Sequence, residues 1–332
     1  MDEAASEVAL TEPPRLTAPD DGPALLLYNS KSRRGHEALP EVLEALSARG
    51  IALHGHHRLS RDLRVDEVVR DALAQGVRRV FVGGGDGTLN IVVRHLLGKD
   101  VILGVLPLGT GNDFARSLGI EPTLEAACDA IAGGYTARVD VGLANGHPFL
   151  NAVSLGIASA IAKRLTPELK RRVGKLAYPV AAFAEIWEHQ PFHVKMTADC
   201  AEVELDALQL VVGNGRYHGA GNMVAPDATL DDHRLDAYTI AAPSSASGGE
   251  STGLGHIRDL GTLARVALSL RRGEHVEHPA VACVRTSSLY VEASPPQDVS
   301  ADGEMIGQTP VRFEIATSAL RVFAPAPPDA KH

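Results

Sequence analysis

The stretch Val80-Phe-Val-Gly-Gly-Gly-Asp-Gly-Thr-Leu-Asn90 is a short apolar strand that ends in consecutive glycines and leads directly into a helix. Glycines at such a turn let backbone N–H groups approach an oxyanion closely, and the N-terminus of the following helix favours negative charge. A tight turn also needs glycine for steric reasons, so Gly83, Gly84 and Gly85 leave both interpretations open. Asp86 favours a phosphate site, because an anion inside a phosphate cradle needs a cation such as Mg²⁺ beside it.

A second loop of the same kind, Pro107-Leu-Gly-Thr-Gly-Asn-Asp-Phe-Ala-Arg116, follows the next predicted strand. In a parallel sheet both loops lie at the carboxyl edge, where ligands bind, so we expect them to face one nucleotide. Thr110 offers a hydroxyl, while Asn112 and Asp113 have the alternative role of helix N-caps. Arg116 lies one turn further on, where it can pair with Asp113.

Two common nucleotide-binding motifs are missing from the sequence. The pattern GxxxxGKS/T does not occur, which excludes a P-loop ATPase or GTPase. The glycine loop also lacks the GxGxxG pattern with an acidic residue about 20 positions later, which argues against hydride chemistry on a dinucleotide.

Around these loops the chain alternates between apolar strands and amphipathic helices. This alternation predicts an α/β fold, with a doubly wound parallel sheet covered by helices on both faces. We expect the strands at 23–28, 51–54, 79–82 and 101–106, and the helices at 37–49, 65–75, 88–97 and 113–118.

From about Val139 the pattern changes to many short strands, which predicts a β-rich, sandwich-like second domain. We expect strands at 149–154, 205–212, 235–240, 280–284, 289–292 and 311–315, helices at 176–187 and 256–270, and a flexible Ser/Gly-rich insertion at 243–255. The chain then divides into a disordered tail (1–22), an α/β domain (23–138), a β-rich domain (139–325) and a C-terminal tail (326–332).

The composition limits the possible functions. The 332 residues suffice for two domains, and the net charge of -9 argues against nucleic-acid binding, because a phosphate backbone would repel the protein. The three cysteines, Cys128, Cys200 and Cys283, lie far apart, which excludes a disulfide framework and fits a reducing cytoplasm. No apolar run approaches the ~18 residues of a membrane span, so we expect any membrane contact to be peripheral.

Taken together, the motifs resemble those of a known family. Gly84-Gly-Asp-Gly-Thr88 with Pro107-Leu-Gly-Thr-Gly-Asn-Asp-Phe-Ala115 is similar to the catalytic domain of diacylglycerol kinases, sphingosine kinases and their soluble bacterial lipid-kinase relatives. NAD kinases and phosphofructokinases share the first motif, whereas the second narrows the match to lipid kinases. The resemblance runs from about residue 24 to 325, through further motifs at 174–178, 225–232, 272–275 and 302–304.

The resemblance implies an ATP- and Mg²⁺-dependent lipid kinase that phosphorylates diacylglycerol or a related lipid. The first domain would bind the nucleotide and the β-rich domain the lipid, with Asp86 organising the catalytic Mg²⁺. The residues expected to bind the nucleotide are Asn29, Ser32, Ser60, Gly83, Gly84, Gly85, Asp86, Gly87, Thr88, Thr110, Asn112, Asp113 and Arg116.

The first loop, Asn29-Ser-Lys-Ser-Arg-Arg-Gly35, departs from the Asn-Pro-x-Ser-Gly of the family. It lacks the proline and places glycine later, although Asn29 and Ser32 remain and the added basic residues lie near the expected phosphates. Ser60 is the counterpart of a nucleotide-contacting threonine that the family has after its second strand.

In the bacterial relatives, the glutamate of the late Asp-Gly-Glu motif is the general base for the lipid hydroxyl, which assigns that role to Glu304. A carboxylate suits the task, because phosphoryl transfer needs mainly positioning and electrostatic support. The alternative is that Asp302-Gly303 is merely a hairpin turn with Glu304 solvated beside it.

The family also binds a structural Mg²⁺ through the last Asp of an Ala-Pro-x-Ala-x-Leu-Asp-Asp run and two backbone carbonyls. This assigns Asp232 as the side-chain ligand, with carbonyls from Thr229 and Arg234. His233 departs from the family, which usually has glycine there, and a positive φ at that position would be strained.

Two other functions remain open: an NAD-kinase-like phosphotransferase, and a catalytically silent lipid-binding protein on the same fold. The basic residues between Lys163 and Lys175 form either a patch for anionic lipid headgroups or a solvated helix face. The expected location is the cytoplasm, with peripheral contact at the inner face of the membrane. The sequence does not determine the oligomeric state, and a homodimer is one alternative.

Overall fold

The first part of the chain forms a parallel sheet. The computed structural model describes residues 22–29, 38–60, 62–164, 190–199, 201–242 and 253–327. Its first four strands, in the order β2-β1-β3-β4, are β1 (Ala24–Tyr28), β2 (Leu53–Arg58), β3 (Arg79–Gly84) and β4 (Ile102–Pro107). Leu25, Leu26 and Leu27 of β1 are almost wholly buried, as expected for a parallel strand covered on both faces. The predicted α/β fold is confirmed.

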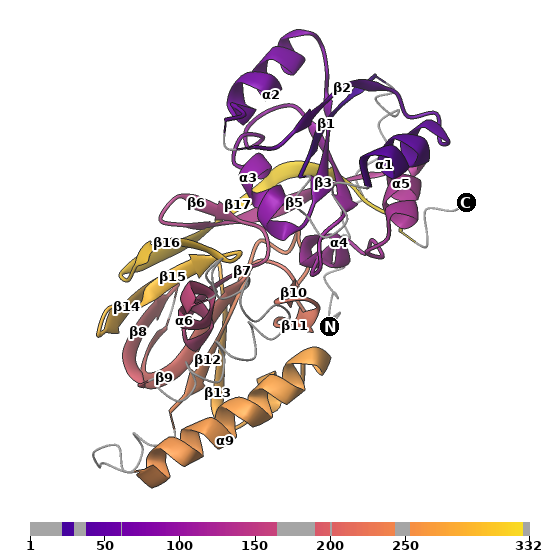
Figure 1. Cartoon of the computed structure of the whole chain (residues 1–332). Helices are drawn as coiled ribbons and strands as arrows, with labels where there is room; N and C mark the ends of the chain where they lie inside the picture. Colours follow the sequence, from indigo (N-terminus) through magenta and orange to yellow (C-terminus); the bar gives the residue numbers. More distant parts are fainter. Residues whose placement is uncertain are drawn as a thin grey trace, which may run out of the picture.

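Helices lie on both faces of this sheet. α1 (Ala38–Ser47) and α5 (Leu124–Gly133) pack against each other on one side, whereas α2 (Val65–Ala74) and α3 (Asp86–Val93) lie on the other (Figure 1). The order in which strands are added reverses at β1, because β2 lies on one side of it and β3 on the other, while all the strands stay parallel. The carboxyl ends of these two strands therefore border the crevice in which doubly wound sheets bind ligands.

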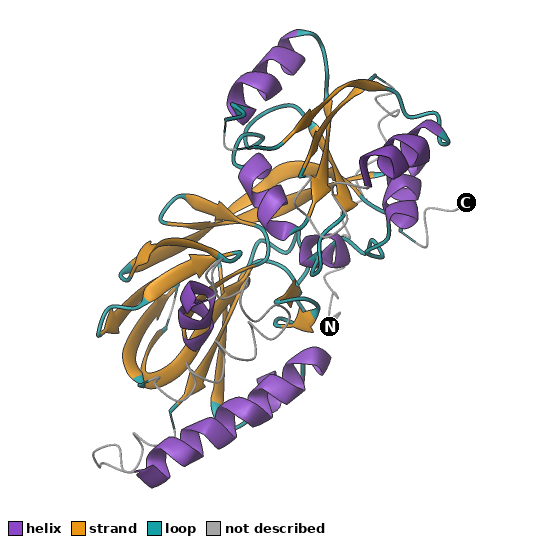
Figure 2. Ribbon diagram, viewed as in Figure 1, coloured by secondary structure: helices purple, strands orange, loops and turns teal. Residues whose placement is uncertain are grey.

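The second part of the chain is dominated by antiparallel strands, drawn in orange in Figure 2. It consists of β6 (His147–Phe149), β7 (Ala152–Gly156), α6 (Ile157–Arg164), β8 (Phe192–Ala198), β9 (Glu202–Gly213), β10 (Tyr217–His218), β11 (Asn222–Met223), β12 (Leu235–Ala241), α9 (Gly253–Ser269), η3 (Leu270–Arg272), η4 (Glu274–Glu277), β13 (Val281–Thr286), β14 (Ser288–Ser294), β15 (Asp298–Ala301) and β16 (Glu304–Gln308). Alternating apolar side chains of these strands form its core, in which the rings of Phe149 and Phe313 meet edge to face. The predicted β-rich second domain is confirmed.

One long strand joins the two parts. β17 (Val311–Phe323) pairs antiparallel with β14 through its first residues and parallel with β4 through Arg321 and Val322. It also pairs antiparallel with β5 (Thr136–Ala144), with a break in register between Ala316 and Leu320. The two sheets are therefore one continuous sheet, and β5 spans the position at which the sequence divides the domains.

Several sequence predictions differ from the structure or fall outside its description. The strand predicted at 149–154 is broken at Leu150 and Asn151, between β6 and β7. The predicted helix at 176–187 lies outside the described residues. So does most of the predicted insertion at 243–255, whose last residues begin α9.

Candidate functional site

The two glycine loops touch each other at the carboxyl edge of the sheet. Gly85 follows β3 and Gly109 follows β4, and a Cβ added to Gly109 would lie only 2.4 Å from the Cα of Gly85. A Cβ on Gly84 would lie 2.5 Å from the side chain of Thr88. These positions therefore accept only glycine, and the backbone stays uncovered where a ligand can approach it.

The first hollow, of about 490 Å³, contains five of the thirteen residues predicted to bind the nucleotide. It is lined by Asn29, Gly85, Gly87, Thr88, Ile91, Gly109, Thr110, Asp302, Gly303 and Glu304. The side-chain amide of Asn29 donates to Thr88 Oγ1 at 3.1 Å, which ties the end of β1 to the first turn of α3. The N-cap residue of α3 is Gly85, which has no side chain to cap the helix, so this helix end can serve an anionic ligand.

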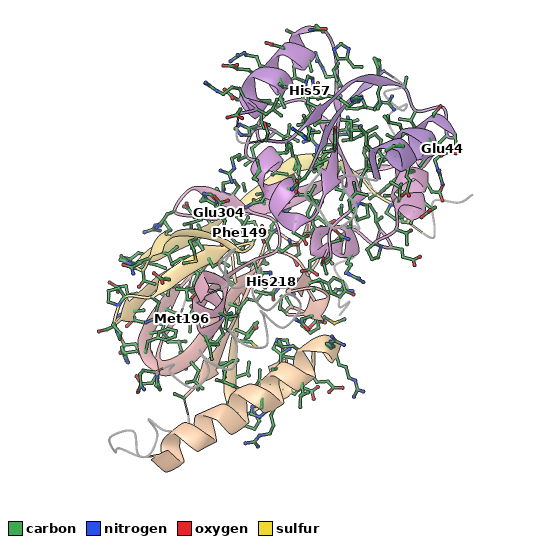
Figure 3. The ribbon with its side chains drawn as sticks, viewed as in Figure 1. Glu44, His57, Phe149, Met196, His218 and Glu304 are labelled. Carbon is green, nitrogen blue, oxygen red and sulfur yellow. The ribbon has the colours of Figure 1, made fainter. Side chains whose placement is uncertain are left out.

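The second hollow, of about 510 Å³, adjoins the first and shares Asp302 and Gly303 with it. Its other lining residues are Asp86, Gly111, Asp113, Asn151, His218, Gly219, Ala220 and Asn222. Figure 3 shows His218 and Glu304 at the junction between the two domains. The site therefore draws on both domains.

Asp86 and Asp113 bring two carboxylates into this second hollow. Asp86 Oδ1 accepts from the Phe114 amide at 3.0 Å and from Asn151 Nδ2 at 3.3 Å. The two oxygens of Asp113 accept from the amides of Ala220 and Gly221, at 2.9 and 2.7 Å. Burial, followed by the charge of nearby Asp86, raises the pKa of the Asp113 carboxyl. The pair thus holds negative charge that a bound cation would relieve.

Asp302 is a site residue to which the sequence assigned no role of its own, only a place in the Asp-Gly-Glu motif or in a hairpin turn. Its carboxylate accepts from the amides of Leu150 at 2.7 Å, Asn151 at 3.0 Å and Ala152 at 3.0 Å. Its φ of 46° is a left-handed conformation that Asp tolerates better than most residues. Burial raises the pKa of Asp302, against the opposing effect of the amides. These amides turn toward Asp302, which breaks the strand predicted at 149–154.

Glu304 follows this turn at the start of β16 and lines the first hollow. Its side chain is about half exposed, and Oε2 accepts from Arg94 Nη2 at 2.9 Å. Arg94 comes directly after α3, the helix that begins with Asp86. Glu304 is therefore held by the nucleotide-side domain rather than solvated freely beside a hairpin.

The residues predicted in the second glycine loop have different partners from those expected. Asn112 adopts a φ of 52° and does not cap the helix α4 (Asp113–Ser117); its Oδ1 instead accepts from the Gly109 amide at 3.0 Å. Arg116 Nε donates to the carbonyl of Gly111 at 3.2 Å. Among the described residues it forms no ion pair with Asp113, so the predicted pair is absent, and Arg116 lines neither of the two hollows.

Two further predicted nucleotide residues come from the loops after β1 and β2. Ser60 follows β2 at the carboxyl edge but is not among the residues that line the first hollow. Ser32 lies outside the described residues. Gly83 lies near the end of β3, where its carbonyl accepts a hydrogen bond from the backbone amide of Asn29 at 2.9 Å.

The residues around Asp232 do not fit the predicted structural Mg²⁺. The Asp232 carboxylate accepts from the backbone amides of Thr229 and Arg234, both at 2.9 Å, and from the guanidinium of Arg285. Donor N–H groups and a guanidinium thus surround the oxygens that a metal would need. His233 has the positive φ expected, 58°, and its amide and ring contact Asp140 instead.

Asp86 and Asn151 fit a Mg²⁺ ion better. The Oδ1 of Asn151 is buried without a hydrogen-bond partner among the described residues, beside the Asp86 carboxylate. Mg²⁺ prefers such oxygen ligands, and it commonly takes one or two carboxylates together with substrate phosphates rather than a full protein cage. The described residues contain no group of three or more His, Cys, Asp or Glu placed to hold a metal.

The described helices include none with the length and apolar character needed to span a membrane.

Comparison with known proteins identifies both halves of the chain. The profile of a family described as the diacylglycerol kinase catalytic domain matches residues 23–144. The profile described as the YegS C-terminal NAD kinase beta sandwich-like domain matches residues 151–251 and 253–324.

Individual relatives agree with these profiles. A Pseudomonas aeruginosa protein named "Probable lipid kinase YegS-like" is 35% identical over 261 residues, 78% of this chain and 80% of its own length. A Staphylococcus saprophyticus protein named "Diacylglycerol kinase" is 29% identical over 91% of this chain and 95% of its own.

Solved structures show the same fold. A Bacillus anthracis crystal structure matches with a TM-score of 0.71 and 26% identity, covering 91% of this chain and 95% of its own. A second crystal structure, of a diacylglycerol kinase from the same organism, has a TM-score of 0.66 and 23% identity, covering 91% and 97% of the two chains.

Proposed function

The chain belongs to the diacylglycerol kinase catalytic-domain family, and on that premise we propose that it is an ATP- and Mg²⁺-dependent lipid kinase. Its substrate class is diacylglycerol or a related lipid with a free hydroxyl. The observation that carries this proposal is the arrangement of the two hollows. Glu304 lines the hollow of the glycine loops, Asp86 lines the adjoining one, and Asp302 and Gly303 border both.

The glycine loops and the N-terminus of α3 are suited to hold the phosphates of the nucleotide. Gly85 and Gly109 leave backbone uncovered at their point of contact, and Asn29 and Thr88 add polar groups beside it. Asp86 and Asn151 would hold Mg²⁺. When bound, this ion neutralises charge on the transferring phosphoryl group. Asp113 adds a second negative charge to the same hollow.

Glu304 is suited to act as the general base. Its carboxylate takes the proton from the lipid hydroxyl as the hydroxyl oxygen bonds to the γ-phosphorus, and the bond from that phosphorus to the bridging oxygen of ADP breaks. Arg94 holds the carboxylate in place at 2.9 Å. The lipid hydroxyl would approach through the second hollow, which meets the first at Asp302 and Gly303.

A second candidate is phosphorylation of NAD, because the matching C-terminal family is described as NAD kinase beta sandwich-like. The loop at 107–116 favours a lipid rather than NAD as the phosphate acceptor, because this motif narrows the resemblance to lipid kinases. A catalytically silent lipid-binding protein would have no use for the paired carboxylates Asp86 and Asp113 beside Glu304.

A lipid acceptor requires peripheral contact with a membrane, and we propose the inner face of the cytoplasmic membrane as the place of action. The basic segment between Lys163 and Lys175, which sequence reasoning offered for this contact, has no described side chains. A homodimer stays an open alternative to a monomer.

The proposed function is tested by transfer of labelled γ-phosphate from ATP, with Mg²⁺, to a panel of acceptors in mixed micelles. The panel contains diacylglycerol, monoacylglycerol, sphingoid bases, ceramide and phosphatidylglycerol, with NAD as the control. We expect product on diacylglycerol or a close relative and none on NAD. Product on NAD and on no lipid would reject the proposal in favour of the second candidate.

A further inference from the structure

A separate hollow of about 390 Å³ lies beside the contact between α4 and β10, and we call it the arginine hollow. Figure 1 shows these two elements near each other. Three arginines line it: Arg116 at the end of α4, Arg138 in β5, and Arg216 just before β10. It shares no lining residue with the two hollows of the candidate active site. It is therefore a separate hollow from the two of the candidate active site.

The three guanidinium groups lack carboxylate partners. None of them lies within 4.0 Å of a carboxylate of the described residues, whereas eight other described arginines do: Arg49, Arg64, Arg70, Arg78, Arg94, Arg234, Arg272 and Arg285. Asp231 is the single carboxylate among the residues that line the hollow. Three guanidinium groups against one carboxylate leave a local excess of positive charge on a chain whose net charge is -9.

A buried hydroxyl in the same hollow also lacks a partner. Ser117 Oγ is inaccessible to solvent and has no hydrogen-bond partner among the described residues. Because this oxygen has no exposed surface, a ligand in the hollow cannot touch it, and the charged donors that line the hollow are the three guanidinium groups. Thr229 and Tyr217 line the hollow as well and carry further hydroxyls.

We propose that the arginine hollow binds a phosphate group, supplied either as free phosphate or as the headgroup of an anionic lipid. Guanidinium groups present paired N–H donors in a planar fork that matches two phosphate oxygens. The volume of the hollow is sufficient for a phosphate with a small substituent. The site does not depend on the proposed lipid-kinase activity.

The test compares phosphate binding by the wild-type protein and by Arg138→Gln/Arg216→Gln, using calorimetry with inorganic phosphate and with chloride at matched ionic strength. We expect the dissociation constant for phosphate to rise by at least about tenfold, because hydrogen bonds to charged groups are strong. Phosphate bound at the glycine loops is common to both proteins, so the difference reports the arginine hollow. Equal phosphate binding by the two proteins would overturn the proposal.

The matched control is Arg271→Gln/Arg312→Gln, which removes two exposed arginines that line none of the three hollows. It should bind phosphate as the wild type does, and an equal loss in the control would show a general charge effect and overturn the site. The single variant Arg138→Gln supplies a second test if the double variant does not fold. It should weaken phosphate binding several-fold, and unchanged binding would contradict the proposal.

Flotation with phosphatidylglycerol vesicles, and with phosphatidylcholine vesicles as the neutral control, distinguishes the two sources of phosphate. A lipid headgroup is the ligand if wild-type protein floats with phosphatidylglycerol and Arg138→Gln/Arg216→Gln does not. Free phosphate is the ligand if both proteins float equally while their calorimetric phosphate binding differs. No difference in either assay would leave the hollow without the proposed ligand and reject it.

Discussion

Arg94 and Glu304 form an ion pair with an N–O distance of 2.9 Å that joins the end of α3 to the start of β16. The two residues lie 210 positions apart in the chain and belong to different domains. Asp86 begins the same helix that Arg94 follows. One short helix thus connects the candidate metal ligand at its first residue to the candidate base at its end.

Arg94→Gln should lower turnover while leaving the protein nearly as stable as the wild type. The ion pair is partly exposed, and such pairs contribute only about 0.2–1 kcal/mol to folding. Loss of positioning is costly for catalysis, so we expect kcat to fall by roughly tenfold or more, with partial rescue by Arg94→Lys. Arg78→Gln, which breaks an exposed pair with Asp100, is the control. Equal kcat values for Arg94→Gln and the control would show that Arg94 does not position Glu304.

Glu304→Gln should separate nucleotide binding from phosphoryl transfer. Glutamine keeps the size of the side chain and can still accept a hydrogen bond from Arg94, but it cannot take the proton of the lipid hydroxyl. Turnover should fall by roughly 10²–10⁴-fold while ATP affinity, measured by calorimetry, stays within a few-fold of wild type. Collapse of ATP affinity would instead make Glu304 a nucleotide-binding residue, and unchanged turnover would place the base elsewhere.

Asp86→Asn should reduce phosphoryl transfer by at least ~10²-fold without unfolding the protein, because it removes a charge that supports the transition state. The amide can still accept the hydrogen bond from Phe114, so the fold should remain. Circular dichroism checks the fold, and labelled phosphate transfer checks activity. Near-normal turnover in this variant would exclude Asp86 from the metal site.

The same variant should also change how Asp113 titrates. Burial and the charge of Asp86 raise the pKa of the Asp113 carboxyl, so its contribution to stability is fully present below its ordinary pKa and is lost as pH rises through the raised value. Asp86→Asn removes the like charge, and this loss should then occur at lower pH. NMR titration of the Asp113 carboxyl and urea unfolding between about pH 3 and 7 measure the shift. An unaltered Asp113 titration would show that the two carboxylates do not interact.

Asp232→Ala should destabilise the second domain without altering its response to Mg²⁺. The change leaves the amides of Thr229 and Arg234 without their acceptor and Arg285 without its closest carboxylate, at a cost of about 1–3 kcal/mol. Urea unfolding with and without Mg²⁺, in the absence of nucleotide, measures both effects. A stabilisation by Mg²⁺ that disappears in Asp232→Ala would restore the metal site expected from the family.

The sequence by itself determined the features that depend on residues close together in the chain: the turns, the strands and the helices. The glycines at 83–85, the loop at 107–116 and the alternation of strands and helices predicted where the phosphate-side hollow would form. Hydrophobic periodicity and turn chemistry act over a few residues, and the carboxyl ends of adjacent parallel strands must lie at one edge.

Only the tertiary structure decided which side chains meet at that edge and which do not. The Asp302 carboxylate accepts from the amides of residues 150–152, and Glu304 pairs with Arg94. Arg116 instead lines the arginine hollow, and Asp232 pairs with Arg285. Each carboxylate and guanidinium could have had several partners of opposite charge. The choice among them depends on packing between segments far apart in the chain and on which donors lie within hydrogen-bond distance of a half-buried oxygen. No local sequence pattern contains this information.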